Sequence, residues 1–212
     1  MKISLTKAGK RFNRDWIFRN VTYEFTSGIS YAITGPNGSG KSTLLQVIGG
    51  AVAASEGKLK YEIQSTKYEE VQDTEVFRNI SIAAPYLELI EEMTVTEFLS
   101  FHQQFKPLLP ALNIPAIIDR IGLAKAAGKQ IRFYSSGMKQ RVKLAQAIFS
   151  DVPCVLLDEP CTNLDAEGIA LYQQLVKDYC SERLVIVSSN DIQEYGFCTE
   201  TINILSYKNG YQ

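Results

Sequence analysis

Residues 35–43 read Gly-Pro-Asn-Gly-Ser-Gly-Lys-Ser-Thr, and no other stretch limits the possible folds of this sequence so strongly. They complete the pattern G-x-x-x-x-G-K-[ST] of a phosphate-binding loop. The apolar run at 29–33 favours a strand before the loop, and residues 44–48 favour a helix after it, which is the context that the motif requires. The sequence therefore predicts binding of a nucleoside triphosphate; an ordinary glycine-rich turn is the alternative.

This stretch, called the phosphate loop below, has an expected role for each polar group. Its glycines let successive N–H groups turn into one concavity, where the start of the helix adds partial positive charge. Lys41 can reach the β- and γ-phosphates, and the hydroxyl of Ser42 is placed to bind Mg²⁺. The other residues of the loop that we expect to bind nucleotide are Gly35, Asn37, Gly38, Ser39, Gly40 and Thr43.

The composition fits one globular domain without unusual charge. The chain has 212 residues, a formal net charge of −1 and 21% charged residues, so no strong basic field favours a nucleic-acid partner. The four cysteines show no C-x-x-C spacing, which disfavours a zinc or redox site and favours buried, reduced thiols in a cytosolic protein. The N-terminus lacks the apolar core of a signal peptide, and no apolar stretch of about 18 residues predicts a membrane span.

The order of the expected elements indicates an α/β fold in a single unit. Strands with turn signals between them are expected at 2–6, 21–25 and 29–34, and a strand at 57–63 should pair with this antiparallel set. A strand at 80–84 precedes helical pieces at 94–121, where Thr94 and Glu97 offer a capping box and prolines break the stretch. Farther on, helices at 136–150 and 165–181 alternate with strands at 155–157, 184–187 and 201–205. Such alternation predicts a mainly parallel sheet with right-handed crossovers.

Two acidic residues, Asp158 and Glu159, follow the apolar run 155–157. This pattern predicts carboxylates at the carboxyl end of a buried parallel strand, where α/β sheets bind ligands. We assign to Asp158 the binding of Mg²⁺ through water, and to Glu159 the polarisation of the water that attacks the γ-phosphate. A solvated strand end is the alternative, which the presence of the phosphate loop disfavours.

A third pattern separates the protein families that share a phosphate loop. Residues 134–141 read Tyr-Ser-Ser-Gly-Met-Lys-Gln-Arg and are expected to open a helix, so that Ser135 and Gly137 form a second anion site or an ordinary N-cap. Here the chain resembles the ATP-binding subunits of ABC transporters, whose signature runs L-S-G-G-Q followed by a basic residue. The resemblance covers essentially the whole chain and includes the order of the motifs.

The resemblance implies a P-loop NTPase fold over residues 1–212, with a helical subdomain at approximately 85–140 and a nucleotide-binding lobe formed by the remainder. It implies ATP as the nucleotide, bound between the phosphate loop of one subunit and the signature of another in a head-to-tail homodimer or heterodimer. It also implies an integral membrane transporter subunit as partner, contacted from the cytoplasmic face. Phe12 matches the aromatic residue that stacks on adenine, with Trp16 as a rival, and either side chain could belong to the core.

Two positions depart from the pattern of the family. Where relatives carry a glutamine after the strand at 80–84, this chain has Pro85, and Tyr86 or Glu88 would have to substitute for it. Where relatives carry a histidine after the strand at 184–187, this chain has Asn190, whose amide can bond a γ-phosphate but cannot carry a proton or positive charge. We interpret His102 as structural.

Three functions follow from these patterns. The first is a subunit that binds and hydrolyses Mg-ATP to power transport by a separate membrane subunit, with export favoured by the short chain. The second is a soluble relative that acts on ribosomes or DNA, although such relatives usually carry two cassettes or a coiled-coil insertion. The third is a partner subunit that binds ATP but hydrolyses it poorly because of Pro85 and Asn190.

Overall fold

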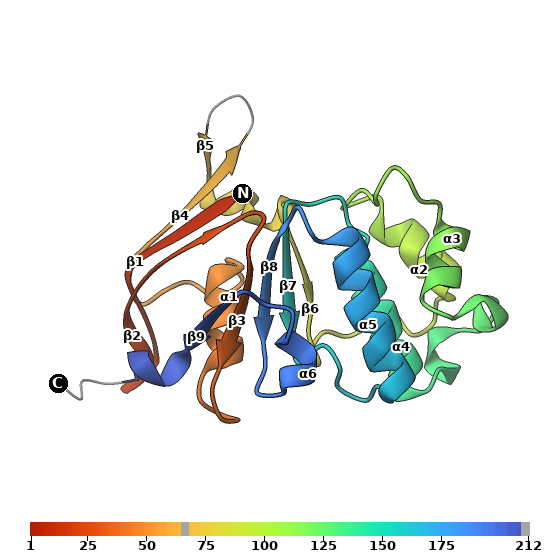
Figure 1. The fold of residues 1–212 in the computed structure, drawn as a ribbon. Helices are drawn as coiled ribbons and strands as arrows, with labels where there is room; N and C mark the ends of the chain where they lie inside the picture. The colour runs from red at the N-terminus through yellow and green to blue at the C-terminus, as the bar shows by residue number, and fades with distance from the viewer. Residues whose placement is uncertain (65–67, 209–212) are drawn as a thin grey trace.

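The computed structural model describes residues 1–64 and 68–208, and these residues form two β-sheets with helices between and beside them (Figure 1). The first sheet is antiparallel and has the order β2-β1-β4-β5. Its strands are β1 (Lys2–Phe12), β2 (Asp15–Thr26), β4 (Glu56–Gln64) and β5 (Tyr68–Val71). The predicted unit of residues 1–212 also includes 65–67 and 209–212, which lie outside the described residues.

The second sheet is parallel throughout its described strands and has the order β6-β7-β8-β3-β9. Every residue of the two central strands β7 and β8 is buried, which explains their continuous apolar sequence. The α/β class and the parallel sheet were both predicted, and both are confirmed. The strands are β3 (Ser30–Thr34), β6 (Ile80–Ala83), β7 (Cys154–Asp158), β8 (Leu184–Ser188) and β9 (Glu200–Asn203).

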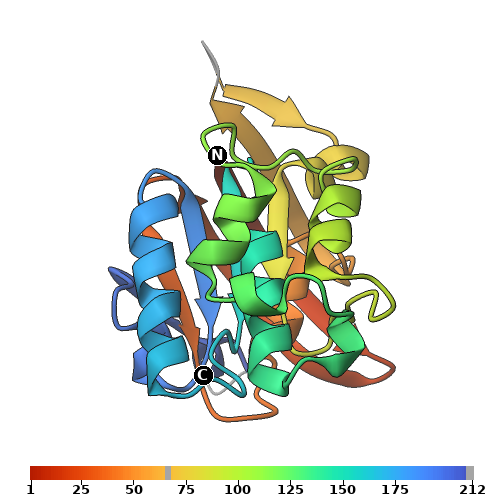
Figure 2. The same cartoon turned by 90° about the vertical axis from the view of Figure 1, so that its right-hand side faces the viewer.

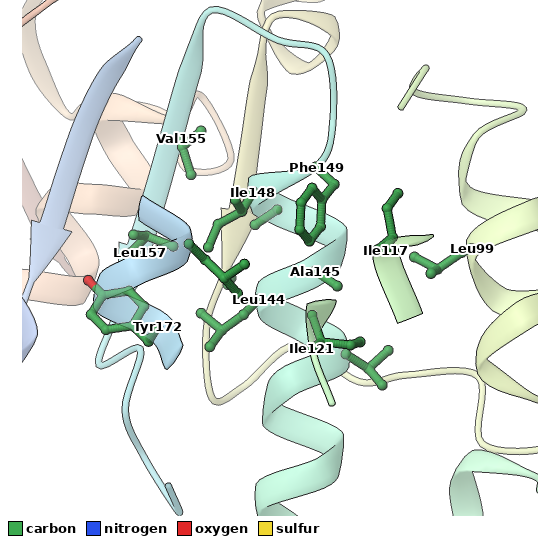
Figure 3. Packing of buried hydrophobic residues seen from close by; sticks show 14 of the residues in the cluster. Leu99, Ile117, Ile121, Leu144, Ala145, Ile148, Phe149, Val155, Leu157 and Tyr172 are labelled. Atoms are coloured by element: carbon green, nitrogen blue, oxygen red, sulfur yellow. The ribbon is translucent and has the colours of Figure 1, made fainter. Parts of the chain in front are cut away.

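Two apolar clusters lie on opposite faces of the parallel sheet. On one face, α1 (Lys41–Ile48) packs between the parallel sheet and the antiparallel sheet. On the other face lie α4 (Ser136–Ile148) and α5 (Ala166–Tyr179), and Leu144 and Ile148 of α4 pack toward the strands (Figures 2 and 3). The helices α2 (Val95–His102) and α3 (Ile114–Arg120) pack on α4 from outside the sheet. No helix in the described ranges is long and apolar enough to cross a membrane.

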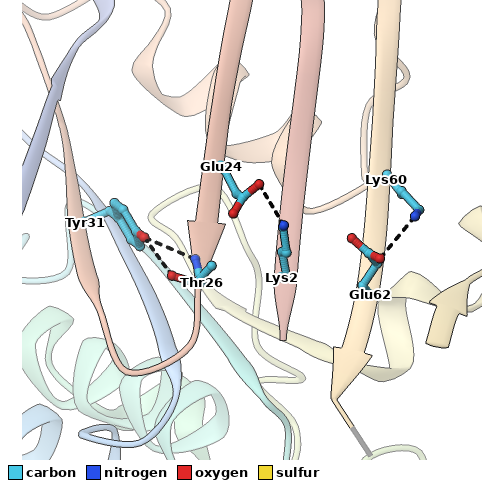
Figure 4. Close-up of polar contacts among 6 residues, drawn as sticks. All are labelled: Lys2, Glu24, Thr26, Tyr31, Lys60 and Glu62. Carbon is cyan, nitrogen blue, oxygen red and sulfur yellow. Dashed lines mark hydrogen bonds and ion pairs between the residues drawn. The ribbon is translucent and has the colours of Figure 1, made fainter. Parts of the chain in front are cut away.

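Ion pairs lie on the antiparallel sheet, and a hydrogen bond fixes the turn that connects this sheet to β3. Lys2 forms an ion pair with Glu24 at 2.8 Å, and Lys60 forms one with Glu62 at 3.1 Å (Figure 4). These pairs are partly exposed, so each contributes little stability. The hydroxyl of Tyr31 accepts the N–H of Thr26 at 3.1 Å and thereby fixes the turn from β2 to β3.

Several predicted boundaries were wrong. The strands at 2–6 and 21–25 are parts of the longer β1 and β2, because bulges after Leu5 and Ala8 let the hairpin continue through polar residues. The last strand ends at Asn203, whose side chain accepts the N–H of Leu205 and starts a 3₁₀ turn. The sequence analysis also missed β5. The helical stretch 94–121 contains α2 and α3 with irregular chain between them.

The starts of α2 and α4 follow the predicted capping signals, and α5 is capped in the same way. Thr94 and Glu97 form a complete capping box at α2, with the Glu97 N–H donating to Thr94 Oγ1 at 3.2 Å. Ser135 caps α4 and Asp165 caps α5 through side-chain oxygens. Local hydrogen bonds thus fix where these helices begin.

Three of the four cysteines are buried, as expected. Cys154, Cys161 and Cys180 are buried thiols, whereas Cys198 is half-buried.

His102 connects the end of α2 to the chain after α4. Its Nε2 lies 2.8 Å from Ser150 Oγ, and that hydroxyl donates to the Gln146 carbonyl at 2.6 Å, so Nε2 carries the proton of the neutral ring. Burial lowers the pKa of His102 to about 4, and the positive charge of Lys106 acts in the same direction. Ser150 precedes the amino end of β7, whereas Asp158 and Glu159 lie at its carboxyl end, so His102 contacts the chain at the opposite end of this strand from these acidic residues.

This depressed pKa predicts a pH-dependent contribution to stability. Between pH values of about 6.5 and 4 the unfolded chain binds a proton at His102 that the folded chain does not bind, so stability falls as the pH falls through this window. In His102→Gln the amide can still donate to Ser150 but cannot titrate. Urea unfolding at about pH 7 and about pH 5 should therefore show the wild type losing stability relative to the variant. An unchanged difference between the two proteins would contradict the assignment.

Candidate functional site

The carboxyl ends of three neighbouring strands, β3, β7 and β8, meet at one edge of the parallel sheet. Asp158 at the end of β7 pairs with Ser188 at the end of β8, and Ser188 also pairs with Ile33 of β3. The phosphate loop follows β3, Glu159 follows β7, and Asn190 follows β8. The topology therefore brings three distant sequence segments to the edge at which α/β sheets bind ligands.

The backbone of the phosphate loop requires glycine at three positions. Gly35, Gly38 and Gly40 have φ values of 146°, 71° and 102°. A Cβ atom on Gly40 would lie 2.4 Å from Cγ2 of Ile17, and one on Gly35 would lie 2.7 Å from Cγ2 of Ile204, so neighbouring side chains fix the loop tightly. Helix α1 begins directly after Gly40, and the N–H groups of a first helical turn have no carbonyl partner inside the helix. The loop thus has the shape and polarity of an anion cradle.

Two buried polar side chains of the loop are suited to phosphate. Lys41 is 4% exposed, and its Nζ donates to the carbonyl oxygens of Gly35 at 2.9 Å and Pro36 at 3.3 Å. Ser39 is 2% exposed, and its Oγ has no hydrogen-bond partner among the described residues. Because both groups can donate hydrogen bonds to phosphate oxygens, the loop fits the nucleotide that its sequence predicts.

Asp158 carries the least satisfied carboxylate of this edge. It is 1% exposed, and its Oδ1 has no hydrogen-bond partner in the described part of the chain. Burial raises the pKa of Asp158, while the nearby hydroxyls of Ser188 and Ser42 and the positive charge of Lys41 act in the opposite direction. A buried carboxylate needs a compensating partner, and Mg²⁺ prefers oxygen ligands such as carboxylate and substrate phosphate. Asp158 and Ser42 are therefore the groups that would hold a Mg²⁺ ion beside a bound phosphate.

Glu159 adopts an uncommon backbone conformation beside this carboxylate. Its φ is 42°, in the left-handed region, and its N–H donates to the Ser188 carbonyl at 2.9 Å. Its side chain is half-buried. A residue that precedes proline, as Glu159 precedes Pro160, normally prefers an extended backbone. Strained conformations of this kind concentrate at functional sites, where surrounding contacts hold them in place.

Asn190 lies exposed just beyond β8. The preceding Ser189 donates its N–H to the Ile33 carbonyl at 3.1 Å, which ties this turn to the strand before the phosphate loop. Asp191 then caps α6 (Ile192–Tyr195) by accepting the N–H of Gln193 at 2.9 Å. Asn190 thus lies between the carboxyl end of β8 and the start of α6, at the sheet edge of the candidate site, and its side chain is exposed.

Pro85 and Tyr86 lie beyond the end of β6, next to the same edge. Ala83 of β6 pairs with Leu157 of β7, immediately before Asp158. Burial raises the pKa of Tyr86, the side chain of Gln46 opposes this shift, and the negative charge of Asp158 adds to it. Pro85 contributes its carbonyl, which accepts a hydrogen bond from Lys143 at 2.9 Å.

The signature residues lie in a separate cleft. Ser135 Oγ accepts the Met138 N–H at 3.3 Å, and a Cβ atom on Gly137 would lie 3.0 Å from the Asn163 carbonyl. The cleft has a volume of about 430 Å³ and contains no residue of the phosphate loop; it is lined by Gly122, Leu123, Lys125, Ala126, Ser135, Ser136, Gly137, Met138, Arg141, Asn163, Leu164 and Asp165. Within one chain, Ser135 and Gly137 therefore do not join the phosphate loop.

The two aromatic candidates for adenine stacking differ in their surroundings. Phe12 is 50% exposed at the end of β1, and Lys10 lies over its ring at 5.0 Å from the centroid. Trp16 has the guanidinium of Arg19 over its ring at 4.1 Å. The next residue, Ile17, contacts Gly40, so this hairpin lies beside the phosphate loop. Phe12 has the more accessible ring.

The sequence analysis missed three groups that the structure brings into this region. Ser188 is buried beside Asp158, and its Oγ has no hydrogen-bond partner among the described residues. Gln140 and Glu194 are buried polar residues that contact the chain just after Glu159. The sequence offered one weak signal for each of the three. Ser188 is a polar residue at the end of an apolar strand, Gln140 is a polar residue shortly after the signature, and Glu194 is one shortly after Asn190.

Comparisons with known proteins give a consistent picture. The model of the ABC transporter family matches residues 18–162. The cytochrome c biogenesis ATP-binding export protein CcmA of Rhizobium meliloti is 28% identical over 200 residues, which cover 93% of this chain and 94% of CcmA. The lantibiotic transport ATP-binding protein SrtF of Streptococcus pyogenes is 27% identical over 188 residues, which cover 86% of this chain and 77% of SrtF.

Among solved structures, one similar protein is the ATP-binding cassette MJ0796, in a dimeric post-hydrolysis state bound to ADP and Pi. It has a TM-score of 0.80 and 25% sequence identity, and the likeness covers 95% of this chain and 94% of that chain.

The geometry of the phosphate loop predicts different effects of alanine at two of its glycines. In Gly40→Ala the new methyl would overlap Ile17 in a left-handed backbone, so ATP affinity should fall about tenfold or more. In Gly38→Ala the backbone strain is similar, but the methyl meets open space, so the loss should be smaller. Calorimetric titration with Mg-ATP measures both, and adding Ile17→Ala should partly restore Gly40→Ala. Equal losses at the two glycines would contradict this geometry.

Proposed function

The chain belongs to the ABC transporter family, and we propose that it binds and hydrolyses Mg-ATP to power transport by a separate membrane subunit. The observation that carries this proposal is the meeting of the phosphate loop, the unsatisfied carboxylate of Asp158 and the strained Glu159 at one sheet edge. Each of these three parts matches one requirement of phosphoryl transfer: phosphate binding, a metal ligand and a group that orients water.

The proposed reaction assigns a task to each group of this edge. Lys41 and the N–H groups of the loop bind the β- and γ-phosphates, while Ser42 and Asp158 hold Mg²⁺. The metal neutralises charge on the phosphate oxygens when it is bound. Glu159 accepts a hydrogen bond from the attacking water and orients it toward the γ-phosphate, and the amide of Asn190 donates to a γ-phosphate oxygen. Phe12 stacks on the adenine ring.

We propose that two cassettes close head to tail around the nucleotide. The signature cleft of Ser135 and Gly137 contains no residue of the phosphate loop, so a second chain has to supply that contact. The similar MJ0796 cassette is dimeric in its solved structure, which supports this arrangement. Closure on ATP and reopening after hydrolysis would then do mechanical work, because ATP binds the closed state more tightly. The second chain is either another copy or a related subunit.

We propose that hydrolysis is slow compared with relatives that carry the usual glutamine and histidine. Asn190 cannot take a proton, and Pro85 offers only a carbonyl that already accepts a hydrogen bond from Lys143. Tyr86 directly follows Pro85, and its hydroxyl would be the group that contacts the attacking water in place of the missing glutamine. Loss of one such group typically lowers a rate by about 10²–10³.

The membrane partner is proposed from the relatives. Both CcmA and SrtF are named as ATP-binding proteins of export or transport, and no helix in the described ranges of this chain could itself cross a membrane. We therefore place the protein on the cytoplasmic face of a membrane, bound to an integral membrane subunit, and favour export as the direction. Approximately residues 85–140, which include α2 and α3, form the proposed helical subdomain that faces this partner.

Purification of the tagged chain from detergent-solubilised membranes of its own cell, followed by mass spectrometry, tests this function. Glu159→Gln should be introduced to keep ATP bound, and Mg-ATP should be present throughout. We expect a stoichiometric multispan membrane protein together with two cassette subunits. Lys41→Ala is the matched control: it should lose the second cassette but keep the membrane protein. Recovery of ribosomal or DNA-binding proteins without any membrane protein would contradict the proposal.

A further inference from the structure

The peptide bond between Pro160 and Cys161 is held on both sides by buried side chains. Nε2 of Gln140, which is 3% exposed, donates to the Pro160 carbonyl at 2.7 Å. On the other side, the Cys161 N–H donates to Oε1 of Glu194, which is 5% exposed, at 2.7 Å. We call Gln140 and Glu194 the peptide clamp. The clamped peptide begins one residue after Glu159.

The two members of the peptide clamp come from the two segments that would sense the nucleotide. Gln140 lies in α4, which opens at the signature residue Ser135. Glu194 lies in α6, which follows Asn190. The signature helix and the segment after β8 therefore contact the same peptide plane, although 54 positions separate them in the sequence (194 − 140).

The peptide clamp helps to hold the unusual backbone conformation of Glu159. With a φ of 42°, Glu159 needs contacts on both sides to keep a conformation that isolated residues avoid. Its own N–H is fixed by the Ser188 carbonyl at 2.9 Å on the side of β8. The peptide clamp supplies the constraint on the following side. Without it, φ of Glu159 could relax to a negative value and carry the carboxylate away from the γ-phosphate position.

Glu194 is itself rigidly supported. Its main-chain carbonyl accepts the hydroxyl of Tyr172, a fully buried residue of α5, at 2.7 Å. Burial raises the pKa of Glu194, and the side chain of Ser189 and the N–H of Cys161 oppose that shift. A buried carboxyl group with a single backbone donor on Oε1 and a fixed main chain is suited to positioning a neighbour, because it has little freedom to move.

We propose that Gln140 and Glu194 are positioning residues that hold Glu159 in its catalytic conformation and link it to the signature helix and to the segment that follows Asn190. This proposal rests on the proposed ATP hydrolysis. Since neither side chain lines the phosphate loop, their loss should lower the rate of the chemical step and leave ATP binding by one chain unchanged.

The test compares steady-state phosphate release and Mg-ATP affinity in variants of the full chain. Gln140→Met keeps the side-chain volume but removes the donor, and Glu194→Ala removes the acceptor; each should lower kcat about tenfold or more while Kd for Mg-ATP changes less than about twofold. Glu194→Gln, whose Oε1 can still accept the Cys161 N–H, should retain most of the rate. Gln173→Ala is the control, because Gln173 contacts α6 through the Gln193 carbonyl at 2.8 Å but does not touch the clamped peptide.

The outcomes separate this inference from the proposed function. Wild-type kcat in both Gln140→Met and Glu194→Ala, with Glu159→Gln inactive, would overturn the positioning role and leave the ATPase function in place. Equal losses of kcat and affinity would also overturn it, because they would indicate a general structural defect. If Glu194→Ala does not fold, Tyr172→Phe is the milder variant, because it removes only the hydrogen bond from the Tyr172 hydroxyl to the Glu194 carbonyl. A wild-type kcat in Tyr172→Phe would then count against the inference. Wild-type phosphate release no higher than that of Glu159→Gln would overturn both proposals.

Discussion

The buried carboxylate of Asp158 is the constraint on which the candidate site depends. Its strand β7 is buried along its whole length, so the charge at its end has no access to bulk water. The described residues leave Oδ1 without a hydrogen-bond partner, while Ser42 and Lys41 provide a hydroxyl and a positive charge nearby. A carboxylate in such surroundings is unfavourable unless a cation completes it. The phosphate loop and Asp158 therefore have to lie at the same edge of the sheet. The order β7-β8-β3 provides this, with the single strand β8 between them.

The sequence predicts the phosphate loop and the buried strands β7 and β8 well, because backbone conformation, close packing and apolar burial determine which residues can stand there. Gly35 and Gly40 are required by backbone conformation and by the close approach of Ile204 and Ile17, so the motif implies the shape. The buried strands β7 and β8 follow from uninterrupted apolar runs. The full lengths of β1 and β2 could not be predicted, because bulges allow polar residues to continue a hairpin that local preference would end.

Contacts between a side chain and a distant backbone group were the least predictable. Gln140 and Glu194 bind main-chain atoms of Pro160 and Cys161. Any residue could provide the carbonyl and any residue but proline the N–H, so the sequence carries no matching partner signal. The same applies to the strained φ of Glu159, which its neighbours impose rather than its own side chain.

The most direct measurement is calorimetric binding of ATP to the wild type and to Asp158→Asn, each with Mg²⁺ and with a chelator. If Asp158 holds the metal, the wild type should bind ATP more tightly with Mg²⁺ than without it. The variant should lose most of this metal dependence, while its affinity for ATP without metal is equal or higher because a negative charge beside the phosphates has been removed. A variant that keeps the full Mg²⁺ dependence of the wild type would contradict the assignment of Asp158 and, with it, the proposed organisation of the site.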